Sequence, residues 1–222
     1  MIKNTIFILS IIGAVLNTSA CKEEKTTKPV QIQTPEEIRN FIKDSEWTSI
    51  AVELRPQEDR TGSGKIQPFY VSRTFKFTDK DKFTGTIRSF GDPYGKLPLV
   101  QFEFKGRVEW QGEHPVAKGA QKIDYVLDEG FIVTPLHQNF ADALNSVPAK
   151  GLKKFELNVP QDILKKEFPL FSIKEGQIVK DYDLIYIYEG MLFMGAKHVD
   201  GTPFDKPENR PHLLQIPLVR KK

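Results

Sequence analysis

The sequence predicts a mainly β protein, with a single antiparallel barrel-like (lipocalin-like) domain and a few short helices over residues 34–222. Three observations lead to this prediction. Apolar and polar residues alternate through much of residues 47–127, turn-forming residues separate these segments, and seven of the sixteen Phe lie within this range. Strands with one apolar and one charged face suit an antiparallel sheet curled around its own interior, and one barrel can use the whole length of the domain.

The alternation is clearest in two segments. In residues 100–110, the side chains predicted to share the inner face are Val100, Phe102, Phe104, Val108 and Trp110. In residues 69–78, the corresponding apolar side chains are Phe69, Val71, Phe75 and Phe77. Because successive side chains of a strand point to opposite faces, these residues form the predicted core.

Further strands are expected at residues 47–54, 83–90, 120–127, 184–188, 191–196 and 214–220. In the first of these, Ile50, Val52 and Leu54 are expected to share the core-facing side. The turn sequences between neighbouring strands are Asp79-Lys80-Asp81, Gly91-Asp92-Pro93 and Glu189-Gly190. Short connections of this kind favour an antiparallel meander.

Three helical segments are predicted. Thr34 can cap a helix that begins at Pro35, with Ile38, Phe41 and Ile42 on one face. The apolar spacing of residues 135–145 predicts a second short helix, and residues 160–166 are expected to form a helical turn.

The N-terminus has the anatomy of a targeting segment. Residues 1–20 combine Lys3, a short apolar run and small residues directly before Cys21, the only cysteine of the chain. This arrangement resembles a bacterial lipoprotein signal peptide, which implies acylation of Cys21 and a membrane anchor. The alternative is a plain secretory signal that leaves a free thiol. Residues 21–33 are polar and predicted to form a flexible tether.

The acidic start of the tether, Lys22-Glu23-Glu24, leaves two interpretations open. It resembles the export signal of surface lipoproteins in Bacteroidetes, or its charges simply keep the tether solvated. The expected location is therefore the bacterial cell envelope, as an outer-membrane lipoprotein that could also be exposed at the surface.

Composition and motifs argue against several functions. The net charge of +3 is too small to favour nucleic acid as a partner. The chain has no Gly-x-Ser-x-Gly, His-Glu-x-x-His or phosphate-binding glycine loop. We therefore expect a protein that is not an enzyme and that carries neither a cofactor nor a metal.

Arg73 is the most informative single residue. Alternation places it on the same face as Val71 and Phe75, where an unpaired charge would be very costly. It either holds the head group of a lipid or forms an internal ion pair, for instance with Glu53.

The last polar loop carries a group of charged residues: Asp200, Asp205, Glu208 and Arg210. Their carboxylates could ligate calcium, but their spacing is not that of an EF-hand. The favoured interpretation is structural, with hydrogen bonds and an ion pair among Asp205, Glu208 and Arg210 that pin the loop. Arg55-Pro56 is expected to fix the end of its strand in a similar way.

The order of several short motifs resembles the domain of the adenomatosis polyposis coli down-regulated family, whose vertebrate members are membrane-anchored Wnt antagonists. The matching segments, in order, are Trp47-Thr48-Ser49, Glu53-x-Arg55-Pro56, Ser72-Arg73-Thr74-Phe75, Asp92-Pro93, Gly106-Arg107, Gly119, Val133-Thr134-Pro135, Leu144-Asn145, Leu192-Phe193-Met194-Gly195, Asp200-Gly201, Asp205-x-Pro207-Glu208-x-Arg210 and Gln215-x-Pro217-Leu218-Val219. This chain lacks the cysteines of the extracellular members and has one copy of the domain where vertebrate members have two.

The resemblance implies a barrel with an apolar interior that can take a lipid chain. The expected function is therefore binding of a fatty acid or similar ligand at the envelope, with Phe75, Phe77, Phe102 and Phe104 lining the site and Arg73 as its polar handle. The alternative is an adhesion or assembly module with a filled barrel. In that case loops such as residues 60–67 and 197–210 would bind a protein or a glycan.

Overall fold

The computed structural model describes residues 34–59, 63–147 and 149–221. The predicted signal peptide (residues 1–20), the acylation of Cys21 and the tether (residues 21–33) lie outside the described residues. No helix within the described ranges is long and apolar enough to cross a membrane.

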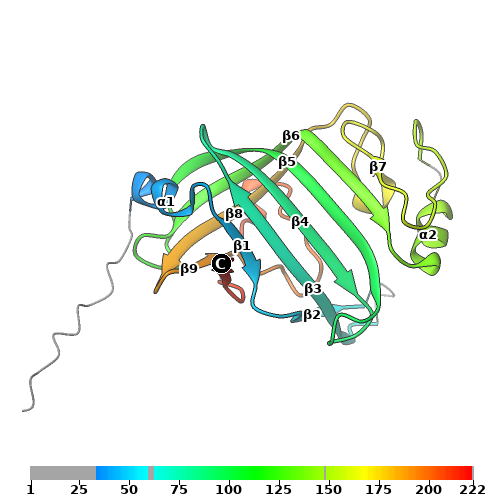
Figure 1. Cartoon of the computed structure of the whole chain (residues 1–222), viewed down its shortest axis with the longest axis horizontal. Helices are drawn as coiled ribbons and strands as arrows, with labels where there is room; N and C mark the ends of the chain where they lie inside the picture. Colours follow the sequence, from blue (N-terminus) through cyan, green and yellow to red (C-terminus); the bar gives the residue numbers. More distant parts are fainter. Residues whose placement is uncertain (1–33, 60–62, 148, 222) are drawn as a thin grey trace, which may run out of the picture.

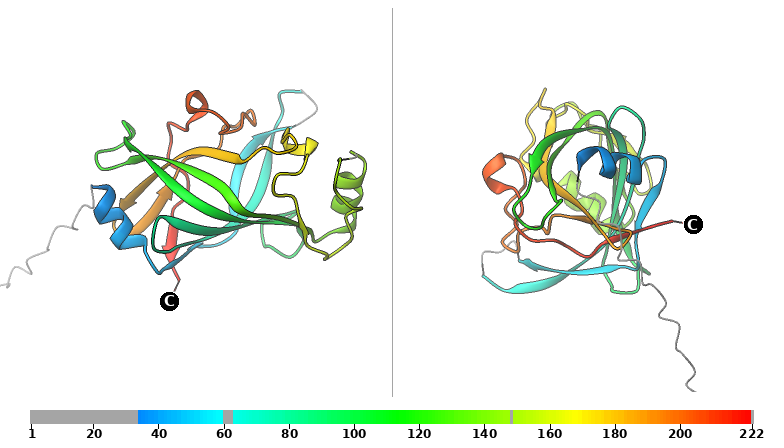
Figure 2. Two further views of the ribbon diagram at one scale, coloured as in Figure 1. Left: turned by 90° about the horizontal axis from the view of Figure 1, so that it is seen from above. Right: turned by 90° about the vertical axis from the view of Figure 1, so that its left-hand side faces the viewer.

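The prediction of a barrel-like antiparallel fold is confirmed. Ten strands form one sheet, and a second pairing between β1 and β3 closes most of it into a ring (Figure 1; Figure 2, right). In order around the ring, the strands are β1 (Glu46–Ser49), β10 (Leu218–Arg220), β9 (Met191–Met194), β8 (Val179–Tyr188), β6 (Gln121–Pro135), β5 (Pro98–Glu113), β4 (Lys82–Phe90) and β3 (Ile66–Phe77). Strands β2 (Glu53–Glu58) and β7 (Gln161–Asp162) extend the sheet beyond the ring.

Two helices lie at opposite ends of the barrel (Figure 1). Helix α1 (Pro35–Ile42) begins with a capping box between Thr34 and Glu37, and it buries Ile38 and Ile42 against the barrel. Helix α2 (Gln138–Asn145) begins later than the pattern predicted, because the His137 side chain accepts a hydrogen bond from the Asn139 N–H and caps it. Two short 3₁₀ turns, η1 (Pro169–Phe171) and η2 (Pro207–Asn209), lie in the C-terminal third.

The single strand predicted at residues 47–54 is wrong in its continuity and in its inner face. The chain breaks between β1 and β2, and Ile50 and Leu54 are 63% and 60% exposed. Beyond the break Glu53 takes the inward position, because it pairs with Arg73 inside the barrel. The ion pair of Glu53 therefore moves the inward-facing positions of this segment by one residue relative to the predicted apolar alternation.

The helical turn predicted at residues 160–166 is also wrong. Gln161 and Asp162 pair with Val133 and Ile132 as strand β7. The N–H of the next residue, Ile163, donates to the carbonyl oxygen of Phe131 at 2.7 Å, and the Ile163 side chain is almost fully buried. Strand pairing satisfies backbone groups that a short isolated helix would leave free, and here it outweighs the local helical pattern.

Close packing between β5 and β6 depends on glycine. A Cβ atom on Gly106 would lie 1.9 Å from the carbonyl oxygen of Val126, which is a backbone atom that cannot rotate away. The pairing of β5 with β6 shifts at this residue, as expected for a β-bulge. Gly106 therefore allows the long β5 to bend around the barrel.

The segment from Gly195 to Pro217, called the strap here, runs over the outside of the sheet (Figure 2). Phe204 of the strap is buried, and so are the outward-facing Asp124 and Leu184 of the strands that the strap covers. The Tyr182 N–H donates to the carbonyl oxygen of Phe204, which ties the strap to β8. The strap therefore adds a second apolar layer outside β6 and β8.

Candidate functional site

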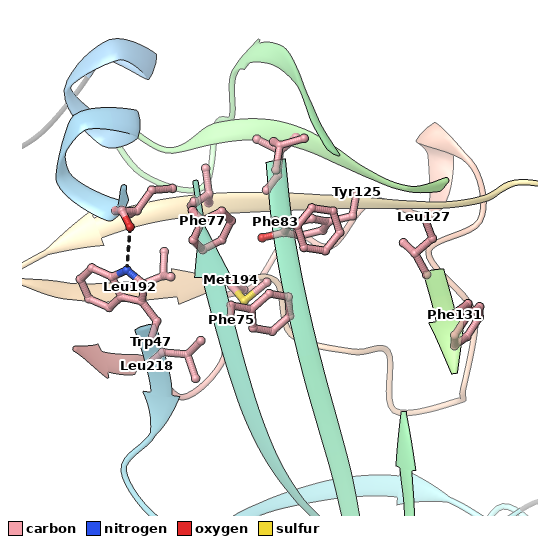
Figure 3. Packing of buried hydrophobic residues seen from close by; sticks show 14 of the residues in the cluster. Trp47, Phe75, Phe77, Phe83, Tyr125, Leu127, Phe131, Leu192, Met194 and Leu218 are labelled. Carbon is pink, nitrogen blue, oxygen red and sulfur yellow. Dashed lines mark hydrogen bonds between the residues drawn. The ribbon is translucent and has the colours of Figure 1, made fainter. Parts of the chain in front are cut away.

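The interior of the barrel around α1 is filled with aromatic rings (Figure 3). The centroid of the Phe75 ring lies 5.7 Å from that of Phe104 and 5.8 Å from that of Tyr125. Phe77 and Phe83 complete this cluster. Ring separations in this range are those of packed aromatic cores, so three of the four Phe side chains predicted to line a ligand site (Phe75, Phe77 and Phe104) pack against other core aromatic rings.

Phe104 also fills the space above Gly85, its cross-strand neighbour. A Cβ atom at Gly85 would lie 2.0 Å from the Phe104 ring. Phe102 behaves differently, since it is only partly buried and stacks on Phe171 with the ring centroids 5.2 Å apart. Phe171 is 40% exposed, so some aromatic surface reaches the end of the barrel opposite α1.

The predicted ion pair of Arg73 with Glu53 is confirmed. The Arg73 side chain is 2% exposed, and its Nε lies 2.9 Å from Glu53 Oε1. Its Nη2 donates to the carbonyl oxygen of Ile216 at 2.6 Å, and its Nη1 lies 3.4 Å from the sulfur of Met194. All three nitrogen atoms of the guanidinium are therefore engaged inside the protein.

Glu53 also contacts the two remaining polar side chains of this network, Arg55 and Ser49. Arg55 Nη2 lies 2.7 Å from Glu53 Oε2, and the Ser49 hydroxyl donates to Oε1 at 2.6 Å. Burial tends to raise the pKa of Glu53, but Arg73, Arg55 and Ser49 together bring that pKa below its ordinary value. Arg55, which was predicted to fix the end of its strand, is therefore a second ion-pair partner of Glu53.

A second buried polar residue, Asp183, lies inside the barrel and was not predicted from the sequence. Asp183 points inward from β8, and its Oδ1 accepts hydrogen bonds from the N–H groups of Leu184 (2.7 Å) and Gly195 (2.8 Å). Burial, reinforced by the charge of Asp181, raises the pKa of Asp183 to about 7. Within the described residues, the buried hydroxyl of nearby Tyr125 has no hydrogen-bond partner.

The buried residue of the C-terminal loop motif is Arg210. Its Nη2 lies 2.6 Å from Asp124 Oδ1, and its Nη1 donates to the carbonyl oxygens of Ile123 (2.6 Å) and Asp183. The predicted ion pair with Asp205 or Glu208 is wrong, because Arg210 turns inward to a carboxylate 86 residues away. The prediction that Arg210 pins its loop is confirmed.

The acidic residues of this loop make local contacts instead. Asp200 Oδ1 accepts from the Thr202 N–H at 2.9 Å, and Asp205 Oδ1 accepts from Asn209 Nδ2 at 2.9 Å. Glu208 is exposed in η2. Over the described parts of the chain, no three His, Cys, Asp or Glu residues come together as a metal site would require.

Two concavities lie outside the aromatic cluster. One, of about 170 Å³, lies between α1, the β3–β4 turn and Trp110, and Phe77 is at its edge. The other, of about 290 Å³, lies between α2 and residues 152–155. Neither is lined by Phe75, Phe102, Phe104 or Arg73.

An apolar area on the outside of the barrel was also not predicted. Leu54, Tyr70 and Phe90 lie side by side across β2, β3 and β4. The loop that follows β4 packs back onto this row, since a Cβ atom on Gly95 would lie 3.0 Å from Val52 and 3.6 Å from Phe90. We call Leu54, Tyr94 and Leu97, the exposed side chains of this region, the outer apolar patch.

The loop that carries the outer apolar patch has a fixed shape. Asp92 accepts hydrogen bonds from the N–H groups of Tyr94 (2.8 Å) and Leu97 (2.6 Å). Tyr94 is nevertheless 80% exposed. At protein interfaces a few aromatic side chains contribute most of the binding energy, and Tyr94 is an aromatic side chain that an ordered loop presents to solvent beside Leu97.

No protein-family model matches this chain, and a search of curated proteins finds no match. The geometry of the barrel and its surface is therefore the basis for proposing a function. Strand alternation placed Arg73 inside the barrel, whereas Glu53 was named as its candidate partner although it lies off the apolar phase of its own strand. Asp183 shares the inward phase of Ile185 and Ile187, which is the one sequence signal that could have revealed it.

Proposed function

We propose that the chain is an adhesion or assembly module of the cell envelope, anchored through acylated Cys21, that binds its partner with the outside of a filled barrel. The observation that carries this proposal is Tyr94, which is 80% exposed on a loop ordered by Asp92. The packed aromatic interior and the internal ion pair of Arg73 support it, because they occupy the place of an apolar ligand.

One of the two loops expected from the sequence to bind a partner does not belong to the proposed binding surface. Residues 197–210 belong to the strap, where Phe204 and Arg210 are buried against the barrel. In the other expected loop, residues 60–62 lie outside the described residues, and Ile66 and Gln67 belong to β3. The outer apolar patch therefore takes the place of these loops in the proposal.

Membership of the family that the sequence motifs resemble remains a proposal, and so does its implied lipid ligand. One observation favours a lipid as the second candidate. Phe102 and Phe171 leave aromatic surface accessible at the end of the barrel opposite α1. An acyl chain bound there would contact these two rings and leave Arg73 paired with Glu53.

Replacement of Tyr94 by Ala is expected to weaken binding of the purified domain to envelope preparations from its own cells by at least about tenfold, the usual effect of losing a central aromatic anchor. Sedimentation of the domain with the envelope fraction measures this. Tyr188→Ala is the matched control, because Tyr188 is also exposed but lies at the end of β8, away from the outer apolar patch. Equal binding by the Tyr94→Ala variant and the wild-type protein would contradict the proposal.

A further inference from the structure

The concavity between α2 and residues 152–155 has an apolar floor. Leu144 and Phe155 are buried at its base, and Leu152 packs against the same core. Val147, at 42% exposure, and Ala149 complete the apolar lining. Its volume of about 290 Å³ is at the lower end of the range for small-molecule sites.

Hydrogen bonds fix the shape of this pocket on two sides. The side chain of Asn145 accepts from the Phe155 N–H at 2.7 Å and donates to the Phe155 carbonyl oxygen at 2.9 Å. The side chain of Gln161 likewise accepts from the Lys153 N–H at 2.8 Å and donates to the Lys153 carbonyl oxygen at 3.2 Å. A ligand would therefore enter a pocket whose walls are already ordered, which lowers the entropy cost of binding.

The charge at the pocket is positive. Lys153 and Lys154 line it, and neither forms an ion pair with an acid in the described part of the chain. The neighbouring Lys150 is already occupied, since it pairs with Glu175 at 2.9 Å. Two lysine residues that line an apolar pocket are complementary to a molecule with a carboxylate at one end and a short hydrocarbon chain at the other.

We propose that this pocket binds a small amphipathic carboxylate of the medium-chain fatty acid type. The hydrocarbon chain lies on Leu144, Leu152 and Phe155, and the carboxylate faces Lys153 and Lys154. A volume of about 290 Å³ accommodates on the order of ten non-hydrogen atoms at roughly 30 Å³ each, which corresponds to a chain as long as that of octanoate. The site lies outside the barrel interior and does not depend on the outer apolar patch.

Amide chemical shifts of the whole chain, recorded while sodium acetate, hexanoate, octanoate or palmitate is added, test this proposal. Octanoate is expected to bind saturably in the millimolar range and to shift the resonances of the pocket residues. Hexanoate binds more weakly, and hexanol and hexylammonium bind more weakly than hexanoate. Each methylene up to octanoate strengthens binding about two- to fourfold, with no further gain for palmitate.

Substitutions separate this site from unspecific binding. The double variant Lys153→Gln/Lys154→Gln is expected to weaken octanoate binding at least about fivefold. The variant Lys76→Gln/Lys206→Gln removes the same charge from exposed positions outside the pocket lining and stays within about twofold of wild type. Val147→Asp, at the exposed rim, provides a second test by repulsion. Unchanged affinity in the Lys153/Lys154 variant, hexanol binding as tightly as hexanoate, or shifts centred away from the pocket would overturn the proposal.

Discussion

Replacement of Arg73 by Met is expected to lower the free energy of unfolding by about 3 kcal/mol, because it leaves the buried carboxylate of Glu53 without its main partner. The same change frees the carbonyl oxygen of Ile216, which accepts from Arg73 at 2.6 Å. Arg55 and Ser49 remain beside Glu53 and limit the loss. Urea unfolding at neutral pH, followed by circular dichroism, measures this difference.

Two further variants show whether the loss comes from the ion pair. Glu53→Gln combined with Arg73→Met removes both charges and is expected to recover much of the stability, since a buried pair often contributes little compared with neutral side chains. Arg88→Met removes an exposed arginine of the adjacent β4 and is expected to change stability by less than about 0.5 kcal/mol. A loss below about 1 kcal/mol in the Arg73→Met variant would contradict the buried ion pair.

Replacement of Asp183 by Asn is expected to stabilise the protein at pH 8 by about 2 kcal/mol or more. The pKa of Asp183 is about 7 in the folded barrel and near its ordinary value of 3.8 in the unfolded chain. Between these values the folded state binds the additional proton, so wild-type stability falls as the pH rises through this window. Above about pH 7 Asp183 is ionised in the folded state, so the full free-energy cost of burying its charge is present.

The amide introduced by Asp183→Asn would keep an oxygen acceptor for the N–H groups of Leu184 and Gly195, but it does not titrate. Thermal unfolding between pH 4 and pH 8 should therefore show a fall in stability for wild type that is much smaller in the Asp183→Asn variant. Asp181→Asn is the informative comparison, because loss of this neighbouring charge should lower the folded-state pKa of Asp183 and so narrow the window from its upper end without abolishing it. Identical pH profiles for the wild-type and Asp183→Asn proteins would contradict a buried, titrating Asp183.

The barrel could be predicted because a strand with one buried face repeats every two residues. In β3 this period placed Phe69, Val71, Arg73, Phe75 and Phe77 inside, and all of them are buried except Phe69, which is half-buried. The same rule failed at residues 50–54, where the chain breaks and Glu53 turns inward. The preference of Glu53 for the interior depends on Arg73, which is 20 residues away, so a local pattern cannot show it.

The candidate sites were less predictable than the strands, because they depend on long-range packing. Arg210 was expected to pair within its loop, but Asp124 is the acid that the fold brings to it. The outer apolar patch exists because the loop after β4 packs back onto Val52 and Phe90. Residues of a connecting loop carry no periodic signal for such a contact, so their exposure had to come from the structure.

The central claim is that the barrel is filled by its own side chains and binds its partner from outside. Native mass spectrometry of the chain without its first 21 residues, before and after incubation with palmitate, tests this most directly. The claim predicts that any palmitate complex beyond the level seen with an unrelated soluble protein persists in the Arg73→Met variant and is weakened in the Lys153→Gln/Lys154→Gln variant, because the fatty acid binds the pocket beside α2 and not the interior. A one-to-one complex that is lost in the Arg73→Met variant would contradict it and would identify the interior as a lipid site.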